Sequence, residues 1–151
     1  MTRISWHEYF IGIAKAVSVR SVDPHTKHGC VLTHNNLIIG CGYNSFPQGM
    51  ADDNLPTTRP LKYEFITHSE INSIYNMTSA IRGFTAYITG EPCFNCLKAL
   101  YQRGASEIHW GGQESRMIDD EDRRLKKMFL DNILGGYTAQ EMSITFGDKN
   151  G

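Results

Sequence analysis

Two short segments carry residues whose types and spacing fit a catalytic metal site. The segment THSEIN contains His68 and Glu70, and the segment EPCFNC contains Cys93 and Cys96. A catalytic zinc ion takes three nitrogen or sulfur ligands from the protein and keeps its fourth position open for water. The set therefore predicts zinc held by His68, Cys93 and Cys96, with Glu70 beside the bound water as a proton shuttle.

The expected position of the two cysteines supports metal binding. Both should lie in the first turn of a helix that Pro92 begins, because proline suits the first helical position. The positive end of the helix dipole favours the thiolate, which is the form of cysteine that binds metal. Taken singly, these residues also fit a buried histidine, two core thiols and a solvated glutamate, so the prediction depends on the whole set.

The elements that must position this set follow from periodicity and turn signals. A capping box, Ser-x-x-Glu, precedes apolar residues at helical spacing and predicts a helix from Ser5 to about Val19. An Asn-Asn pair between two apolar, β-branched runs predicts a hairpin of strands 30–34 and 37–43. Further expected elements are helices at 67–75, 93–102 and 119–131, strands at 84–89, 107–110 and 142–146, and a long loop at 44–65.

This order of elements predicts a single domain over residues 1–151. A hairpin followed by alternating helices and strands favours an α/β fold, a three-layer α/β/α sandwich around a mixed sheet of about five strands. The run of mixed charge at 119–127 is interpreted as a solvated helix face. Cys30 and Cys41 lie on apolar strands and are expected to be buried thiols.

Composition and charge exclude several classes of function. Fifteen basic and sixteen acidic residues give a formal net charge of −1, and no basic stripe is visible. Polynucleotide binders depend on such a stripe, so we expect no polynucleotide partner. No apolar run approaches the roughly 20 residues of a membrane span, and no signal-peptide pattern begins the chain. We therefore expect a cytoplasmic protein without a membrane partner.

The metal motif, His-x-Glu followed by Pro-Cys-x-x-Cys, resembles the signature of the zinc-dependent nucleobase deaminase superfamily. The segments RSVDPHTKHGC, GYNSFPQG and KYEFITHSEIN are similar to those of the deoxycytidylate (dCMP) deaminase family, over residues 10 to about 110. This resemblance implies a cytidine deaminase-like fold and hydrolytic deamination of dCMP to dUMP with release of ammonia. Three residues depart from the family pattern: Ser45 replaces a glycine, Ser69 an alanine, and His28 an apolar residue.

The resemblance also implies which residues bind the nucleotide. Asn44 is expected to hydrogen-bond the sugar 3′-hydroxyl. Cations and hydroxyls bind phosphate, and the group expected to hold the 5′-phosphate is Arg20, Ser21, Lys27, Lys62 and Tyr63. His28 and Ser69 are expected at the substrate, where His28 alters either substrate preference or pH dependence. Trp110 either packs in the core or an interface, or lines the pocket near the base.

Members of this family are commonly hexamers that dCTP activates and dTTP inhibits, with Mg²⁺ on the triphosphate. The resemblance thus implies a homohexamer with an allosteric nucleotide at Gly42, Tyr43, Asn44, Ser45 and Pro47. Two alternatives stay open. One is deamination of another substrate, namely dCTP, cytidine or adenosine in tRNA, and the other is a zinc-stabilised binding module without turnover. The neutral charge balance argues against deamination of tRNA, because polynucleotide binders are usually basic. The lack of an apparent fourth protein ligand argues against the binding module, because structural zinc sites close all four positions.

Overall fold

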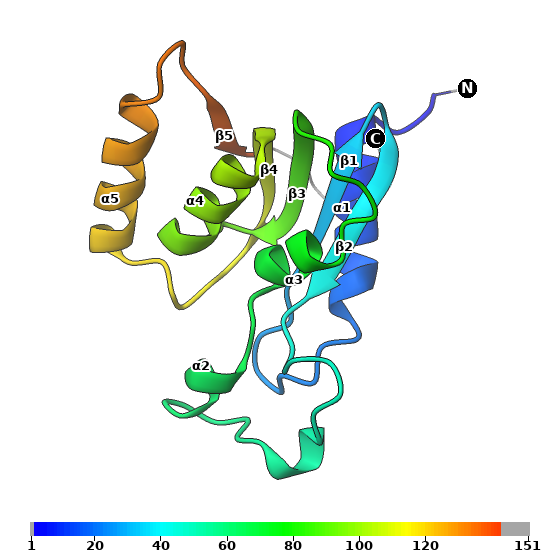
Figure 1. The fold of residues 1–151 in the computed structure, drawn as a ribbon, viewed down its shortest axis with the longest axis vertical. Helices are drawn as coiled ribbons and strands as arrows, with labels where there is room; N and C mark the ends of the chain where they lie inside the picture. The colour runs from blue at the N-terminus through cyan, green and yellow to red at the C-terminus, as the bar shows by residue number, and fades with distance from the viewer. Residues whose placement is uncertain (1, 143–151) are drawn as a thin grey trace.

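Five strands form one mixed sheet in the order β2-β1-β3-β4-β5 in the computed structural model, which describes residues 2–142 (Figure 1). Strand β1 pairs antiparallel with β2 and with β3, whereas β3 with β4 and β4 with β5 are parallel pairs. The strands are β1 (Gly29–His34), β2 (Leu37–Tyr43), β3 (Phe84–Gly90), β4 (Ala105–Gln113) and β5 (Thr138–Glu141). The predicted mixed sheet of about five strands is confirmed.

Helices cover both faces of this sheet and make the predicted three layers. One face is covered by α1, which contacts β1 and β3, and the other by α3 and α4, with α5 packed beside α4 (Figure 1). The helices are α1 (Trp6–Ser18), α2 (Lys62–Phe65), α3 (Ser69–Tyr75), α4 (Phe94–Arg103) and α5 (Asp120–Asp131), with a short 3₁₀ helix at Asp52–Asn54. Within residues 2–142 no helix combines the length and apolarity that a membrane crossing requires.

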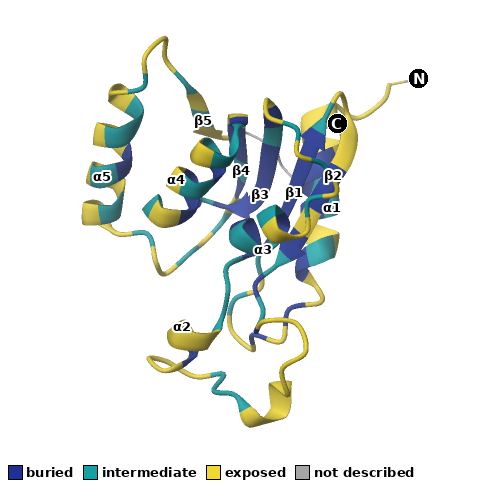
Figure 2. Cartoon of the chain, viewed as in Figure 1, coloured by how far each residue is buried: buried dark blue, intermediate teal, exposed yellow. Residues whose placement is uncertain are grey.

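Alternating side chains of the central strands build a separate core on each face. Val31 and Tyr87 pack with α1, while their neighbours Leu32 and Ile88 pack with α4 on the opposite face. This is the period of two that a strand buried on both faces must have. Figure 2 shows β1 and β3 as the most deeply buried strands of the sheet.

Local signals explain where the elements begin and turn. The Ser5 hydroxyl accepts a hydrogen bond from the N–H group of Glu8 at 3.1 Å and caps α1, as the capping box predicts. Asn35 and Asn36 both have positive φ, 51° and 61°, which is what a two-residue type I′ hairpin turn needs. The expected helix and hairpin are therefore present with nearly the expected bounds.

The long loop after β2 is closed at its base. The N–H of Ser45 donates to the carbonyl of Thr67 at 3.1 Å, and the N–H of Thr67 donates back to the carbonyl of Ser45 at 2.8 Å. The loop also contains the 3₁₀ helix and α2, which the sequence did not predict, because segments of three and four residues are too short to show periodicity.

Two further expectations are wrong, and a third falls mostly outside the described residues. The strand expected at 142–146 lies outside the described residues apart from Met142, and the fifth strand is β5, which ends at Glu141. Cys41 is exposed rather than buried, because it lies on the outer face of the edge strand β2. The helix at 119–127 is not wholly solvated, since Lys126 on α5 is only 6% exposed.

Candidate active site

The predicted metal ligands meet at the N-terminal ends of two helices. His68 is the N-cap residue of α3 and Cys93 that of α4, with nearly equal backbone angles (φ −66°, ψ 154° and φ −68°, ψ 165°). The Nδ1 atom of His68 lies 3.2 Å from Sγ of Cys96 and 3.7 Å from Sγ of Cys93. Tetrahedral zinc with ordinary Zn–N and Zn–S bonds separates such ligand atoms by about 3.6 Å. The three side chains therefore fit zinc, and no fourth His, Cys, Asp or Glu within residues 2–142 joins the group.

The two thiols differ in protonation. A hydrogen bond with the Cys96 thiol, helped by one with His68, lowers the pKa of Cys93 to about 4, although burial of Cys93 opposes the change. The same thiol–thiol hydrogen bond, with burial, raises the pKa of Cys96. One thiolate is thus formed in the protein alone, and a bound cation would displace the proton of the second.

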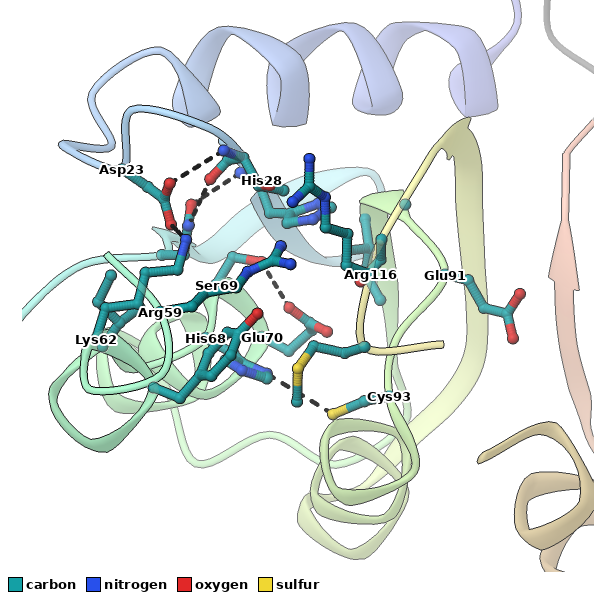
Figure 3. Close-up of a pocket in the computed structure, with 18 residues that line it drawn as sticks. Asp23, His28, Arg59, Lys62, His68, Ser69, Glu70, Glu91, Cys93 and Arg116 are labelled. Carbon is teal, nitrogen blue, oxygen red and sulfur yellow. Dashed lines mark hydrogen bonds and ion pairs between the residues drawn. The ribbon is translucent and has the colours of Figure 1, made fainter. Parts of the chain in front are cut away.

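Glu70 lies beside the ligands without belonging to the ligand group. It is buried, at 6% exposed, in the first turn of α3, and the Ser69 hydroxyl donates a hydrogen bond to its Oε1 atom at 2.6 Å. Figure 3 shows its carboxylate near His68 and Cys93 on the wall of the same pocket. A carboxylate next to a metal that it does not ligate is placed to move protons.

The pocket that contains these groups is built from segments far apart in the chain (Figure 3). They are the loop between α1 and β1, the end of β2, the long loop before α3, the end of β3 and the loop after β4. His68, Cys93 and Glu70 therefore face a space that a small molecule can enter. Such a concave site with a few convergent polar groups is typical of an enzyme active site.

A buried ion pair joins two of these segments. The Nζ atom of Lys62 lies 2.9 Å from Oδ2 of Asp23, and neither side chain is more than 4% exposed. Oδ1 of Asp23 also accepts the N–H groups of His25 and Thr26 at 2.9 and 3.0 Å. Burial raises the pKa of Asp23, but the backbone hydrogen bonds and Lys62 outweigh burial and lower that pKa overall. The pair fixes the long loop to the segment after α1.

Asn44 and His28 shape the adjoining wall. Oδ1 of Asn44 accepts the N–H of His28 at 2.8 Å, and Nδ2 donates to the carbonyl of Thr26 at 2.8 Å. An amide group has a second hydrogen and a second lone pair, so Asn44 can still bind a hydroxyl. Burial lowers the pKa of His28, whose Nδ1 lies 3.3 Å from Oγ1 of Thr89. His28 thus presents a neutral ring to the pocket at pH 7.

The pocket brings together only part of the residues expected to bind the nucleotide. Those that line it are His28, Asn44, Lys62, Tyr63 and Ser69. Ser21 lies behind the wall and donates to the carbonyl of Asn44 at 2.7 Å, while Nζ of Lys27 donates to the carbonyl of Ser21 at 2.8 Å. Arg20 is exposed and donates to the Tyr43 hydroxyl at 3.2 Å. Trp110 packs against the sheet core and does not line the pocket.

Sequence reasoning missed two arginines that line the pocket. Arg59 lies in the long loop just before α2, and Arg116 lies in the loop after β4. Neither belongs to a motif or to a periodic pattern. For Arg59 the available signal was the length of the loop at 44–65, because long loops inside small domains are usually functional, and for Arg116 the sequence carried no signal.

Helix α5 holds the residues on either side of the first cysteine ligand. The Nζ atom of Lys126 donates to the carbonyl of Pro92 at 2.8 Å, lies 2.8 Å from Oδ2 of Asp122 and forms an ion pair with Glu91. Oδ1 of Asp122 accepts the N–H group of Phe94 at 2.8 Å. A helix without metal ligands therefore anchors the turn that carries one.

The segment expected to bind an allosteric nucleotide is bonded to the helix of Glu70. Nδ2 of Asn72, on α3, donates to the carbonyl of Tyr43 at 2.8 Å and to Oγ of Ser45 at 3.1 Å. A Cβ atom on Gly42 would lie 2.5 Å from a backbone nitrogen of α3, so only glycine allows this approach. Any displacement of the segment would reach α3 directly.

A family model, several relatives and a solved structure match this chain over most of its length. The family model of the cytidine and deoxycytidylate deaminase zinc-binding region matches residues 4–111. Human deoxycytidylate deaminase is 34% identical over 140 residues, which cover 87% of this chain and 77% of the human protein. The mouse deoxycytidylate deaminase is 37% identical over 113 residues, covering 70% of this chain but only 64% of the mouse protein. The crystal structure of a dCMP deaminase from the cyanophage S-TIM5, in complex with dCMP and dUMP, has a TM-score of 0.69 at 21% identity and covers 94% of this chain and 100% of that chain.

Proposed function

This chain belongs to the family of cytidine and deoxycytidylate deaminases with a zinc-binding region, and we propose that it hydrolyses dCMP to dUMP and ammonia. The observation that carries the proposal is the buried carboxylate of Glu70 beside three metal ligands in an open pocket. A structural zinc site would close all four positions with protein ligands. The choice of dCMP rests on the human and mouse relatives, which are deoxycytidylate deaminases.

In the proposed chemistry Glu70 carries both protons from the water to the substrate. A zinc ion held by His68, Cys93 and Cys96 would lower the pKa of the attacking water towards neutrality. Glu70 accepts a proton from the water and gives it to N3 of the cytosine ring, which makes C4 more electrophilic. As the water oxygen bonds to C4, Glu70 takes the second proton and delivers it to the exocyclic amine, so that the C4–N bond breaks and ammonia leaves. Ser69 keeps Glu70 oriented through its hydrogen bond to Oε1.

The experiment is a substrate panel with the zinc-loaded full chain. Ammonia release is measured from dCMP, dCTP, cytidine and deoxycytidine, and the highest kcat/KM is expected for dCMP. A higher value for another compound would replace dCMP as the substrate. If a chain with stoichiometric zinc released no ammonia from any of them or from tRNA, the site would be that of a binding module.

Regulation and assembly form a second part of the proposal. We infer a homohexamer that dCTP activates and dTTP inhibits, with Mg²⁺ on the triphosphate, bound at the segment from Gly42 to Pro47. The hydrogen bonds from Asn72 to this segment support the inference, because they connect it to the helix of Glu70. Rates measured across dCTP and dTTP concentrations test the regulation, and flat curves would contradict it. Sedimentation analysis tests the hexamer, which a monomer at working concentration would exclude.

A further inference from the structure

We propose that Asn72 is a positioning residue of the metal centre, because it holds both peptide units that flank the ligand His68. The inference rests on the zinc site of the proposed function and adds to it a residue that does not line the pocket. Asn72 lies on α3, four residues after His68 and two after Glu70.

The backbone and the side chain of Asn72 act on opposite sides of His68. The N–H group of Asn72 donates to the carbonyl of His68 at 3.0 Å, which is the first hydrogen bond of α3. The Nδ2 atom donates to the carbonyl of Thr67 at 3.3 Å. That carbonyl belongs to the peptide unit that joins Thr67 to His68. Because peptide units are planar, these two bonds hold the backbone on both sides of the Cα atom of His68.

The surroundings of the Asn72 side chain require a donor at this point. The Nδ2 atom also donates to the carbonyl of Tyr43 at 2.8 Å and to Oγ of Ser45 at 3.1 Å. Carbonyl oxygens can only accept, so the amide must present its NH₂ group to them, and its two hydrogens are shared among three acceptors. Asn72 thus joins the end of β2, the bridge that closes the long loop, and the residue before the metal ligand.

A second asparagine on α3 makes one of these contacts without the others. The Nδ2 atom of Asn76 donates to the carbonyl of Cys41 at 3.0 Å. Four helical residues rise about 6 Å and two strand residues span about 6.6 Å, so asparagines one turn apart meet alternate carbonyls of the edge strand β2. Both asparagines therefore attach α3 to β2. Of the two, Asn72 is the one that also bonds Thr67.

The first test compares alanine variants of the two asparagines, each loaded with zinc. Asn72→Ala should release zinc to a chromogenic chelator at least about tenfold faster than the wild type, for which 1.4 kcal/mol lost at the site suffices. Asn76→Ala should stay within about threefold, since it loses a single exposed hydrogen bond away from the ligand. The two variants share residue type, helix and partner strand, and differ in exposure and in the number of bonds lost. Release is measured well below the melting temperature of both, so that global unfolding does not contribute.

Turnover gives a second readout. A displaced His68 shifts the metal relative to Glu70, and small misplacements of reacting groups cost up to about 10²-fold in rate. At saturating zinc, the kcat of Asn72→Ala for dCMP should fall at least about tenfold while KM stays within about twofold, because Asn72 does not line the pocket. Asn72→Leu, which fills the space that alanine leaves but also lacks the donor, should show the same changes in zinc release and kcat.

Equal zinc release from Asn72→Ala and Asn76→Ala would overturn the inference. A raised KM with unchanged kcat would also overturn it, because Asn72 would then act on substrate binding. If Asn72→Leu restored both zinc release and kcat, the empty space rather than the lost donor would be the cause, and the inference would be wrong. Zinc release requires no turnover, so the proposed function can fail separately. If the wild type released no ammonia from dCMP but Asn72→Ala still lost zinc faster than Asn76→Ala, the reaction would be wrong and the role of Asn72 would stand.

Discussion

Replacing Lys126 by methionine tests whether α5 secures the metal-binding turn. The substitution keeps most of the side-chain volume but removes a charge whose side chain is only 8% exposed. It leaves the carboxylates of Glu91 and Asp122 facing each other, at 22% and 12% exposure, and leaves the carbonyl of Pro92 without its donor. Breaking a buried ion pair by removing one partner costs about 3–5 kcal/mol. Because both carboxylates keep some contact with water, we expect the lower end, about 3 kcal/mol.

The neighbouring residue provides a matched control. Lys127 lies on the same helix and also pairs with an aspartate four residues away, Asp131, at 2.8 Å, but these side chains are 77% and 60% exposed. Exposed ion pairs contribute about 0–1 kcal/mol, so Lys127→Met should cost well under 1 kcal/mol. The two variants therefore share the chemistry of the substitution and differ in burial and in the number of partners lost, three for Lys126 and one for Lys127.

Urea unfolding of the zinc-loaded chain, followed by far-ultraviolet circular dichroism, gives both free energies. Transfer of zinc to a chromogenic chelator then measures the effect on the metal site, and Lys126→Met should release zinc at least about tenfold faster, since 1.4 kcal/mol lost at the site suffices. A cost below 1 kcal/mol would refute the burial argument. A cost near 3 kcal/mol with unchanged zinc release would show that α5 stabilises the fold without securing the turn.

Three other predictions follow from the site. Glu70→Gln should keep stoichiometric zinc yet lose at least about 10²–10⁴ in kcat, the usual value of a general acid–base, and near-normal turnover would remove Glu70 from the mechanism. Zinc removal by a chelator should abolish activity and lower Tm by at least about 5 °C, because the ligands join α3 to α4; re-added zinc should restore both, and an unchanged Tm would contradict the cross-link. Asp23→Asn should cost about 3 kcal/mol at pH 7. The folded-state pKa of Asp23 is lowered, so its contribution is complete above the unfolded value of about 3.9 and is lost as pH falls through the folded value. The stability difference between wild type and Asp23→Asn should therefore narrow on acidification below about pH 4, and a constant difference would contradict the assignment.

Periodicity and short-range spacing predicted most of the fold. The apolar, β-branched runs marked the first two strands, and the Asn-Asn pair marked the hairpin between them because few residues adopt positive φ. The metal site was predictable for a related reason. Its ligand types are rare enough in combination that His68, Cys93 and Cys96 identified it before any distance was known.

Contacts that depend on tertiary packing could not be predicted in this way. The run of mixed charge at 119–127 suggested a solvated helix face, but only the fold brings Glu91, 35 residues from Lys126, to the ammonium group of Lys126. Arg59 and Arg116 lie in irregular segments, where position along the chain says nothing about direction in space. Cys41 was misjudged because an apolar run on an edge strand looks the same as one on a central strand.

The short bridge between Ser45 and Thr67 separates the segment that covers the pocket from the segment that carries the first metal ligand. His68 follows the bridge directly, so the three metal ligands lie at the N-terminal ends of α3 and α4 and none of them is among the twenty-one residues enclosed. Those residues, with Arg59 and Lys62 among them, cover the pocket instead. Exchanging or resizing that enclosed stretch would change which molecules are admitted while the reactive centre stayed as it is, a division that would let one scaffold acquire new substrates without reinventing its chemistry.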